Sequence, residues 1–300
     1  MTSANAASST RAARPKTKSE KRERALALFA KLRAFHSDAH CELDHDGAFQ
    51  LLVATVLSAQ TTDKLVNKVT PALFAAYPTA PALAAAEPPA VGELLRSGGL
   101  GMYNQKSKNI VGLARALVEH HGGDVPRDIH ALVKLPGVGR KTANVVLGVI
   151  WGTPDGVVVD THVQRLSQRL GFTKETKPET IEKDLDALFP REDWDPLSHT
   201  LIFHGRRVCF AERPACSGCT VNDLCPSAFR AENVGRKPKR ERPAPPSKAP
   251  AKKSTPKKAA AKTPAAKKAA AKTPAAKTPA AKKPAAGAPK RRVSAPKTSR

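Results

Sequence analysis

The chain has 300 residues and a formal net charge of +25, so it is long enough for one or two folded domains and strongly basic. The positive charge lies at the ends: residues 236–300 contain 22 Lys and Arg against one acid, and residues 1–24 contain seven against two. Such ends favour a polyanionic partner. The first 20 residues contain no apolar run, so we expect neither a signal peptide nor a membrane span, and a transit peptide is the second interpretation.

Helical patterns fill the middle of the chain. Apolar residues recur at helical spacing from about Glu23, and the stretch after Asp46 is apolar almost all round, which is typical of a buried helix. That helix ends in small polar residues, among them Gln60, before Asp63, which we expect to cap the next helix. Further helices are predicted over residues 70–76, 80–86, 91–97, 106–120 and 125–135, and Met102 lies in a loop between two of them.

A glycine-rich turn joins the helix that Pro136 ends to an apolar helix that begins near Lys141. Gly137 and Gly139 allow positive φ angles and a close approach of the backbone. The turn therefore points backbone N–H groups outward at a helix N-terminus, which is an arrangement that binds anions. A nucleotide-binding P-loop has four residues between its glycines and a strand before them, so this turn does not predict one.

Asp160 follows a short β-branched run and precedes a helical pattern. An aspartate in this place is an N-cap by default, because its carboxylate accepts hydrogen bonds from the first backbone N–H groups of the helix. Capping also fixes the position of the carboxylate, and catalysis requires such a fixed group. The structural and the chemical interpretations of Asp160 are therefore compatible.

Four of the five cysteines lie close together with the spacing C-x6-C-x2-C-x5-C. Disulfides are not expected in a chain without a secretion signal. Four thiolates satisfy either a zinc ion or a [4Fe–4S] cluster, although structural zinc sites usually consist of two short pairs. Cys41 stands apart, and we expect it to be a small buried apolar residue. The four clustered residues are Cys209, Cys216, Cys219 and Cys225.

Three stretches and the cysteine spacing together resemble the endonuclease III family of helix-hairpin-helix DNA glycosylases. The stretches are residues 57–63 (Leu-Ser-Ala-Gln-Thr-Thr-Asp), 135–143 (Leu-Pro-Gly-Val-Gly-Arg-Lys-Thr-Ala) and 159–162 (Val-Asp-Thr-His). The resemblance covers roughly residues 23–230 and implies an all-α fold of two domains. The basic tail beyond Gly235 is expected to be disordered, because it has a proline every few residues and no apolar side chain larger than Val293. The predicted divisions are a disordered arm (1–22), a cluster domain (23–42 and 154–232), a six-helix domain (43–153, with the helix-hairpin-helix at about 128–150) and a disordered Lys/Ala/Pro-rich tail (233–300).

The resemblance also assigns roles to individual residues. Lys141 would be the nucleophile, which forms a Schiff base at C1′ before β-elimination cuts the strand 3′ to the lesion, and Asp160 would face it across a groove. Gln60 would fill the gap left by the displaced nucleotide, and Met102 would enter the base stack. The four clustered cysteines would hold a [4Fe–4S] cluster. Further contacts to DNA are expected from Gly137, Val138, Gly139, Arg140, Thr142, His162 and Arg213.

The implied substrate is double-stranded DNA with a damaged base, expected to be an oxidised pyrimidine, or an abasic site. The chain would act as a monomer in the bacterial cytoplasm, associated with the nucleoid. An adenine mismatch glycosylase is the nearest alternative, but it typically lacks a lysine at position 141 and carries an extra nudix-like domain. A non-catalytic nucleoid DNA-binding protein and an iron–sulfur electron carrier are further alternatives, and Lys141 could hold a phosphate instead of reacting.

Overall fold

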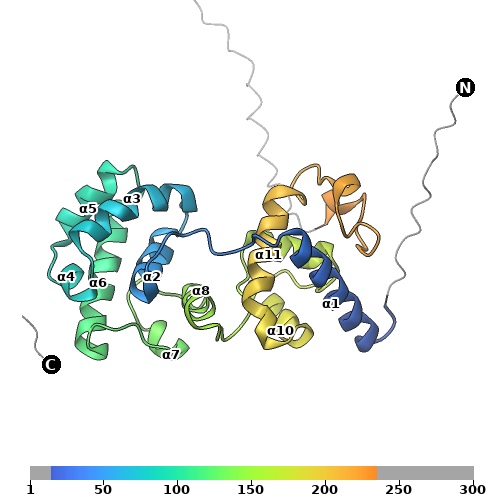
Figure 1. Ribbon diagram of the computed structural model, residues 1–300, viewed down its shortest axis with the longest axis horizontal. Coiled ribbons are helices and arrows are strands. Elements are labelled where there is room, and N and C mark those ends of the chain that lie inside the picture. Colours follow the sequence, from blue (N-terminus) through green and yellow to red (C-terminus); the bar gives the residue numbers. More distant parts are fainter. Residues whose placement is uncertain (1–14, 235–300) are drawn as a thin grey trace, which may run out of the picture. The chain divides into compact units, whose positions relative to one another are not determined.

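The computed structural model describes residues 15–234, whose regular elements are all helices with no strand among them (Figure 1). Of the residues predicted to be disordered, 1–14 and 235–300 lie outside the described residues, whereas Asn233 at the start of the predicted tail ends a 3-10 turn. Three short 3-10 turns accompany the helices, over Arg191–Asp193, Cys216–Gly218 and Ala231–Asn233. The helices are α1 (Lys18–Phe35), α2 (Gly47–Leu57), α3 (Asp63–Ala76), α4 (Ala80–Ala84), α5 (Pro88–Ser97), α6 (Tyr103–His121), α7 (Ile129–Leu132), α8 (Arg140–Trp151), α9 (Thr161–Arg169), α10 (Pro178–Leu188) and α11 (Trp194–Arg207).

Helix α1 begins at Lys18, five residues before the predicted start at Glu23. A capping box fixes this start: the Glu20 backbone N–H donates to Thr17 Oγ1 at 3.1 Å, and the Thr17 backbone N–H donates to the Glu20 carboxylate at 3.4 Å. The prediction that residues 1–22 form a disordered arm is therefore wrong for residues 18–22. The Thr-x-x-Glu pattern was present in the sequence as a signal for this start.

A first hydrophobic core lies among α2 to α8 and contains buried residues from Leu43 to Leu147. Helix α2 contributes most completely, since Leu51, Leu52 and Leu57 have no exposed surface. This confirms the prediction of a buried helix after Asp46. Helix α6 packs against both α4 and α5, and short connections join these three helices in the chain.

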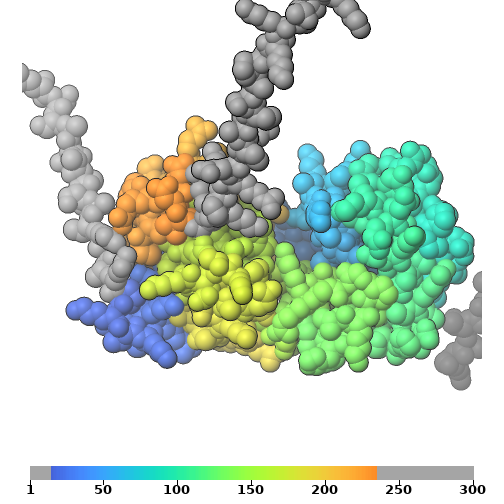
Figure 2. Space-filling view, turned by 180° about the vertical axis from the view of Figure 1, so that it is seen from behind, coloured from blue at the N-terminus to red at the C-terminus, as the bar shows by residue number. Residues whose placement is uncertain are grey.

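A second core joins α1 to α9, α10 and α11 and contains buried residues from 25 to 32 and from 157 to 221. Figure 2 shows α1, in blue, beside the orange segment that ends at residue 234. An ion pair between Lys31 and Asp223 at 2.8 Å connects the same two segments. The two cores therefore draw on different parts of the chain, and the exact domain limits stay a prediction.

Helix α8 packs against α2 of the first core and α11 of the second. Gly148 permits the approach of α11, because a Cβ atom there would collide with the carboxylate of Asp195. Both cores thus determine the position of α8, whose second residue is Lys141.

Candidate functional site

A cavity of about 300 Å³ opens where α2, α3, α8, α9 and α11 meet. Its lining brings together Gln60, Asp63, Lys141 and Asp160, which are separated by up to 100 residues in the sequence. Thr142 lines the same cavity. The residues that sequence analysis singled out from three separate stretches are therefore neighbours in space.

Lys141 is the second residue of α8 and its side chain is exposed. No side chain caps this helix: Gly139 is the N-cap residue, so the first N–H groups of α8 have no capping oxygen. Gly137 has a φ of +77°, and a Cβ there would lie 3.0 Å from Asn109. The expected positive φ is wrong for Gly139, whose φ is −95° because an N-cap residue has extended backbone. A Cβ at Gly139 would meet no atom within 4 Å, so the space in front of the helix is open.

Asp160 caps α9, as predicted. Its Oδ1 atom accepts hydrogen bonds from the backbone N–H groups of His162 and Val163, both at 2.8 Å. Both bonds use Oδ1, so Oδ2 takes no part in the cap. The half-buried carboxylate is thus held in one position at the cavity with one oxygen left for another partner.

Asp63 joins the site, although sequence analysis assigned it only to a helix cap. The cap of α3 is Thr62, and Asp63 is the first residue of the helix. Burial raises the pKa of Asp63, the neighbouring Asp160 raises it further, and Lys141 lowers it. Arg206 Nη2 donates to Asp63 Oδ2 at 3.0 Å, and Arg206 also pairs with Glu42. The one sequence signal for Asp63 was its place in the same polar segment as Gln60.

The other predicted contact residues lie in different surroundings. Gln60, Met102 and Arg213 are exposed and have φ angles of 57°, 54° and 49°. Val138 is buried in the first core, and its backbone N–H donates to Leu135 O at 3.1 Å. His162 is half-buried with Nδ1 at 3.2 Å from Arg165 Nη2, and burial lowers its pKa. Val138 and His162 therefore also pack within the protein.

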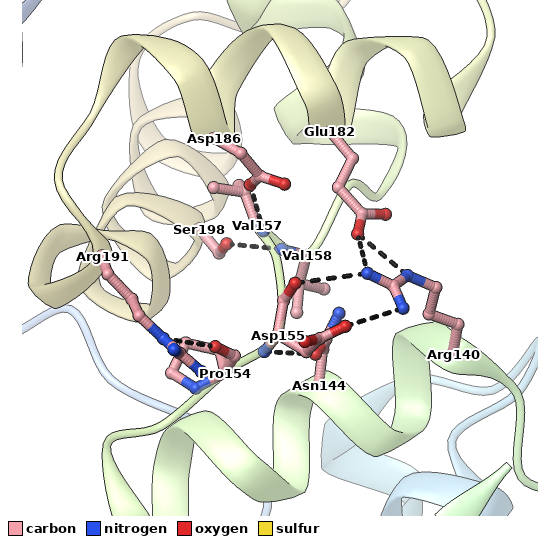
Figure 3. Close-up of polar contacts among 10 residues, drawn as sticks. All are labelled: Arg140, Asn144, Pro154, Asp155, Val157, Val158, Glu182, Asp186, Arg191 and Ser198. Carbon is pink, nitrogen blue, oxygen red and sulfur yellow. Dashed lines mark hydrogen bonds and ion pairs between the residues drawn. The ribbon is translucent and has the colours of Figure 1, made fainter. Parts of the chain in front are cut away.

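Arg140 was expected to contact DNA, but its guanidinium binds within the protein (Figure 3). It pairs with Asp155 at 2.9 Å and with Glu182 of α10 at 3.0 Å, and it donates to the Asp155 backbone carbonyl at 3.2 Å. These bonds tie the N-terminus of α8 to the segment that leads to Asp160. Arg140 is thus placed to fix the position of Lys141 relative to Asp160.

The segment from 154 to 158 is fixed by further hydrogen bonds, which Figure 3 also draws. Backbone N–H groups of Asp155, Val157 and Val158 donate to Asn144 Oδ1 at 2.9 Å, Asp186 Oδ1 at 2.9 Å and Ser198 Oγ at 3.1 Å, respectively. These acceptors come from α8, α10 and α11. The approach to Asp160 is therefore bound to three helices.

The four clustered cysteines are free thiols and line one small cavity together with Arg169 and His204. Burial raises the pKa of Cys225 to about 12 and also raises the pKa of Cys219. Two sulfur atoms have polar neighbours: Arg169 Nη1 donates to Cys209 Sγ at 3.4 Å, and His204 Nε2 lies 3.5 Å from Cys219 Sγ. Four sulfurs around one cavity, with cationic and imidazole neighbours, fit a [4Fe–4S] cluster, in which each thiolate binds a different iron.

Two further findings concern residues 15–234. No group of three or more His, Cys, Asp or Glu side chains in that range is arranged so that it could hold a single metal ion. No helix in the same range is long and apolar enough to cross a membrane. Cys41, predicted to be buried, is partly exposed and packs against the first core, and burial raises its pKa.

Comparison with known proteins agrees with this arrangement. Residues 53–191 match the family of HhH-GPD superfamily base excision DNA repair proteins. An endonuclease III from Synechocystis sp. is 51% identical over 208 residues, which cover 69% of this chain and 94% of that protein. The endonuclease III of Escherichia coli (strain K12) is 40% identical over 200 residues, which cover 67% of this chain and 93% of that protein.

Solved structures give the same result. A non-covalent endonuclease III–DNA complex aligns with a TM-score of 0.64 and 42% identity, covering 70% of this chain and 96% of that chain. A trapped endonuclease III–DNA covalent intermediate aligns with the same TM-score and identity, covering 97% of that chain. The identity, the coverage and the matched helical fold show that this chain belongs to the endonuclease III family of helix-hairpin-helix base excision DNA repair proteins.

Proposed function

We propose that this protein is a bifunctional DNA glycosylase and AP lyase that removes oxidised pyrimidines from double-stranded DNA and cuts abasic sites. One observation carries the proposal: Lys141 and Asp160, a nucleophile and a fixed carboxylate, line the same cavity at the N-termini of α8 and α9. The trapped covalent intermediate of the similar endonuclease III supports a covalent step.

In the proposed reaction, the neutral amine of Lys141 forms a bond to C1′ while the bond from C1′ to the base breaks. The base leaves with the electron pair and takes up one proton that the nitrogen loses. A second proton then passes from the nitrogen to O4′ as the C1′–O4′ bond breaks, which opens the sugar to an imine. Removal of a proton from C2′ then expels the 3′ phosphate. Asp160 Oδ2, which is free of the helix cap, would stabilise positive charge on the sugar and accept a proton.

The contacts to DNA are proposed to come from backbone groups and side chains around this cavity. The uncapped N-terminus of α8, with open space at Gly139, suits a phosphate. Thr142 lies at the same end of the helix, while Gln60 and Met102 project from exposed turns. Gly137, Val138 and His162 would shape the contact surface, and the exposed Arg213 would approach a phosphate.

We further propose that the cysteine cavity holds a [4Fe–4S] cluster, with Cys209, Cys216, Cys219 and Cys225 as ligands. When bound, the cluster supplies a structural crosslink, because it joins four places in the segment after α11. Since the relatives are bacterial, we place the activity in the bacterial cytoplasm, where the basic chain would associate with nucleoid DNA.

The proposed function is tested by borohydride trapping on a duplex that contains one oxidised pyrimidine. We expect a covalent adduct with the wild-type chain and none with Lys141→Ala, because the imine requires the lysine amine. Lys134→Ala is the matched control, since Lys134 is an exposed lysine near the same hairpin and should leave the adduct intact. If wild type binds the duplex but does not trap, the adenine mismatch glycosylase or the DNA-binding protein becomes the better assignment.

Arg140 gives a second prediction. The guanidinium of Arg140 is bonded to Asp155 and Glu182, so its loss should shift Lys141 relative to Asp160. Arg140→Gln is therefore expected to lower the single-turnover cleavage rate about tenfold. The affinity for DNA and its salt dependence should change little. The measurements are single-turnover rates and binding titrations at several salt concentrations.

The same titrations distinguish this role from a phosphate contact. A lysine or arginine that neutralises a phosphate contributes about one to the salt slope, so its loss flattens the slope by that amount. Glu182→Gln, which removes a partner of Arg140 and no cation, should reproduce the rate loss. A flattened slope with Arg140→Gln and a normal rate with Glu182→Gln would show that Arg140 binds DNA instead.

A further inference from the structure

Two exposed turns, one of which contributes Gln60 to the cavity, each contain a residue with left-handed backbone. Gln60, with a φ of 57°, lies in the turn between α2 and α3, and Met102, with a φ of 54°, is the N-cap residue of α6. Among the non-glycine residues from 15 to 234, only Arg213 and Phe229 share this conformation. Left-handed backbone is strained for L residues and persists where surrounding structure holds it. The surrounding structure must therefore hold these two turns in place.

Lys106 forms hydrogen bonds to both turns. Its backbone N–H donates to Met102 O at 3.0 Å, which closes the first turn of α6. Its side-chain Nζ donates to Leu57 O at 2.8 Å and also to Thr61 Oγ1. Leu57 and Thr61 lie on either side of Gln60 in the sequence. One residue thus connects the backbone of the Met102 turn with both ends of the Gln60 turn.

The surroundings of Lys106 are unusual for a lysine. The residue is only 4% exposed, whereas lysine is almost never fully buried unless it is paired. In the described part of the chain, its partners are a carbonyl and a hydroxyl, and no acidic side chain forms an ion pair with it. The carbonyls at the C-terminus of α2 carry partial negative charge, which stabilises a cation there. Burial lowers the pKa of Lys106.

An apolar side chain of similar length would fill the same space without the cost of burying a charge. What lysine adds is a set of donors that reach the Gln60 turn. We propose that Lys106 is a positioning residue that joins the two turns into one rigid unit, so that Gln60 and Met102 enter the duplex together.

This proposal rests on the function proposed above. Displacing a nucleotide from a duplex breaks its stacking and pairing, and side chains that fill the gap offset the loss. Side chains that are already held in position fill the gap with a smaller loss of conformational entropy on binding. An abasic site in single-stranded DNA requires no such displacement. Loss of Lys106 should therefore lower the cleavage rate on a lesion in a duplex and not the rate on the single strand.

The test compares Lys106→Met with Lys108→Met in the full chain, because Lys108 is an exposed lysine on the same helix. Cleavage is measured on a duplex with one oxidised pyrimidine and on a single strand with an abasic site. Lys106→Met is expected to lower the duplex rate, relative to the single-strand rate, about tenfold or more, because it loses hydrogen bonds to a charged group. Lys108→Met should leave that ratio unchanged. An equal loss on both substrates with Lys106→Met overturns the proposal.

A milder variant covers the case in which Lys106→Met folds poorly. Thr61→Val keeps the shape of the half-buried side chain and removes the acceptor for Lys106 Nζ. It should cause a smaller loss with the same preference for the duplex substrate, and the double variant should lose less than the two single effects combined. Fully additive effects would show that the two residues act independently.

A fluorescent base provides a readout that needs no cleavage. With 2-aminopurine opposite the lesion, the wild-type chain should raise fluorescence as the base unstacks, and Lys106→Met should raise it less at the same bound fraction. If the wild type binds but cleaves neither substrate, the proposed function fails, while this fluorescence still decides the role of Lys106. The same rise with wild type and Lys106→Met overturns the positioning role.

Discussion

Replacing Asp160 with asparagine is expected to lower the rate of lesion cleavage by about 10²–10³-fold, as when one stabilising group is removed from a transition state. The fold should remain intact, because asparagine caps helices about as well as aspartate. The asparagine oxygen can accept the bonds from His162 and Val163 that Oδ1 accepts now. The variant therefore removes the charge next to Lys141 and keeps the start of α9. Single-turnover cleavage and thermal unfolding measure the two effects separately.

Two variants control for the structural role of this carboxylate. Asp160→Ala loses the cap as well and should unfold about 1 kcal/mol more easily than Asp160→Asn. Asp128 caps α7 by accepting from the Ala131 backbone N–H at 2.7 Å, and Asp128→Asn should leave both rate and stability nearly unchanged. If Asp160→Asn cleaved at the wild-type rate, the carboxylate would be a helix cap and nothing more.

Replacing Arg169 with methionine is expected to destabilise the second core by about 3 kcal/mol, because it leaves carbonyl groups without their donor. Arg169 has no exposed surface. Its guanidinium donates to the carbonyls of Phe210 at 2.6 Å, Ala211 at 2.9 Å and Val234 at 2.8 Å. These bonds hold the loop that begins at Cys209, so the variant should also bind less iron. Urea unfolding of the iron-loaded protein and iron content per chain test the two expectations.

The matched control for this prediction is an arginine on the protein surface. Arg207 pairs with Asp38 at 2.8 Å and is about half exposed, so Arg207→Met should cost less than about 1 kcal/mol. Arg169→Lys, which keeps the charge but not the planar set of donors, should lie between the two. Wild-type stability together with wild-type iron content in Arg169→Met would mean that other contacts hold the loop.

Much of the local structure around the site could be predicted from neighbouring residues. The Asp160 cap follows from an aspartate before a helical pattern, and the hairpin before Lys141 follows from Pro136 and Gly137. The start of α1 at Lys18 is also encoded locally by the capping box of Thr17 and Glu20, although the predicted start at Glu23 was too late. These features depend on contacts between residues three or four positions apart, which a sequence pattern records directly.

The tertiary structure alone decided which long-range partners these groups have. Arg140 binds Glu182, which is 42 residues away in the sequence. Asp63 meets Lys141 and Asp160 at one cavity, and Lys106 reaches back 49 residues to Leu57. No periodicity encodes such pairs, because they arise from the packing of helices that are far apart in the chain.

The sequence by itself determined the family and the helical class, and it predicts Lys141 and Asp160 as the reactive residues, because short motifs in the right order record local geometry and chemistry. Only the tertiary structure decided that Arg140 pairs with Glu182 and that Lys106 is buried between two strained turns. The physical reason is that the burial and the partners of a charged side chain depend on neighbours from other helices. A sequence motif identifies the charged residue but not the residues that surround it in the folded chain.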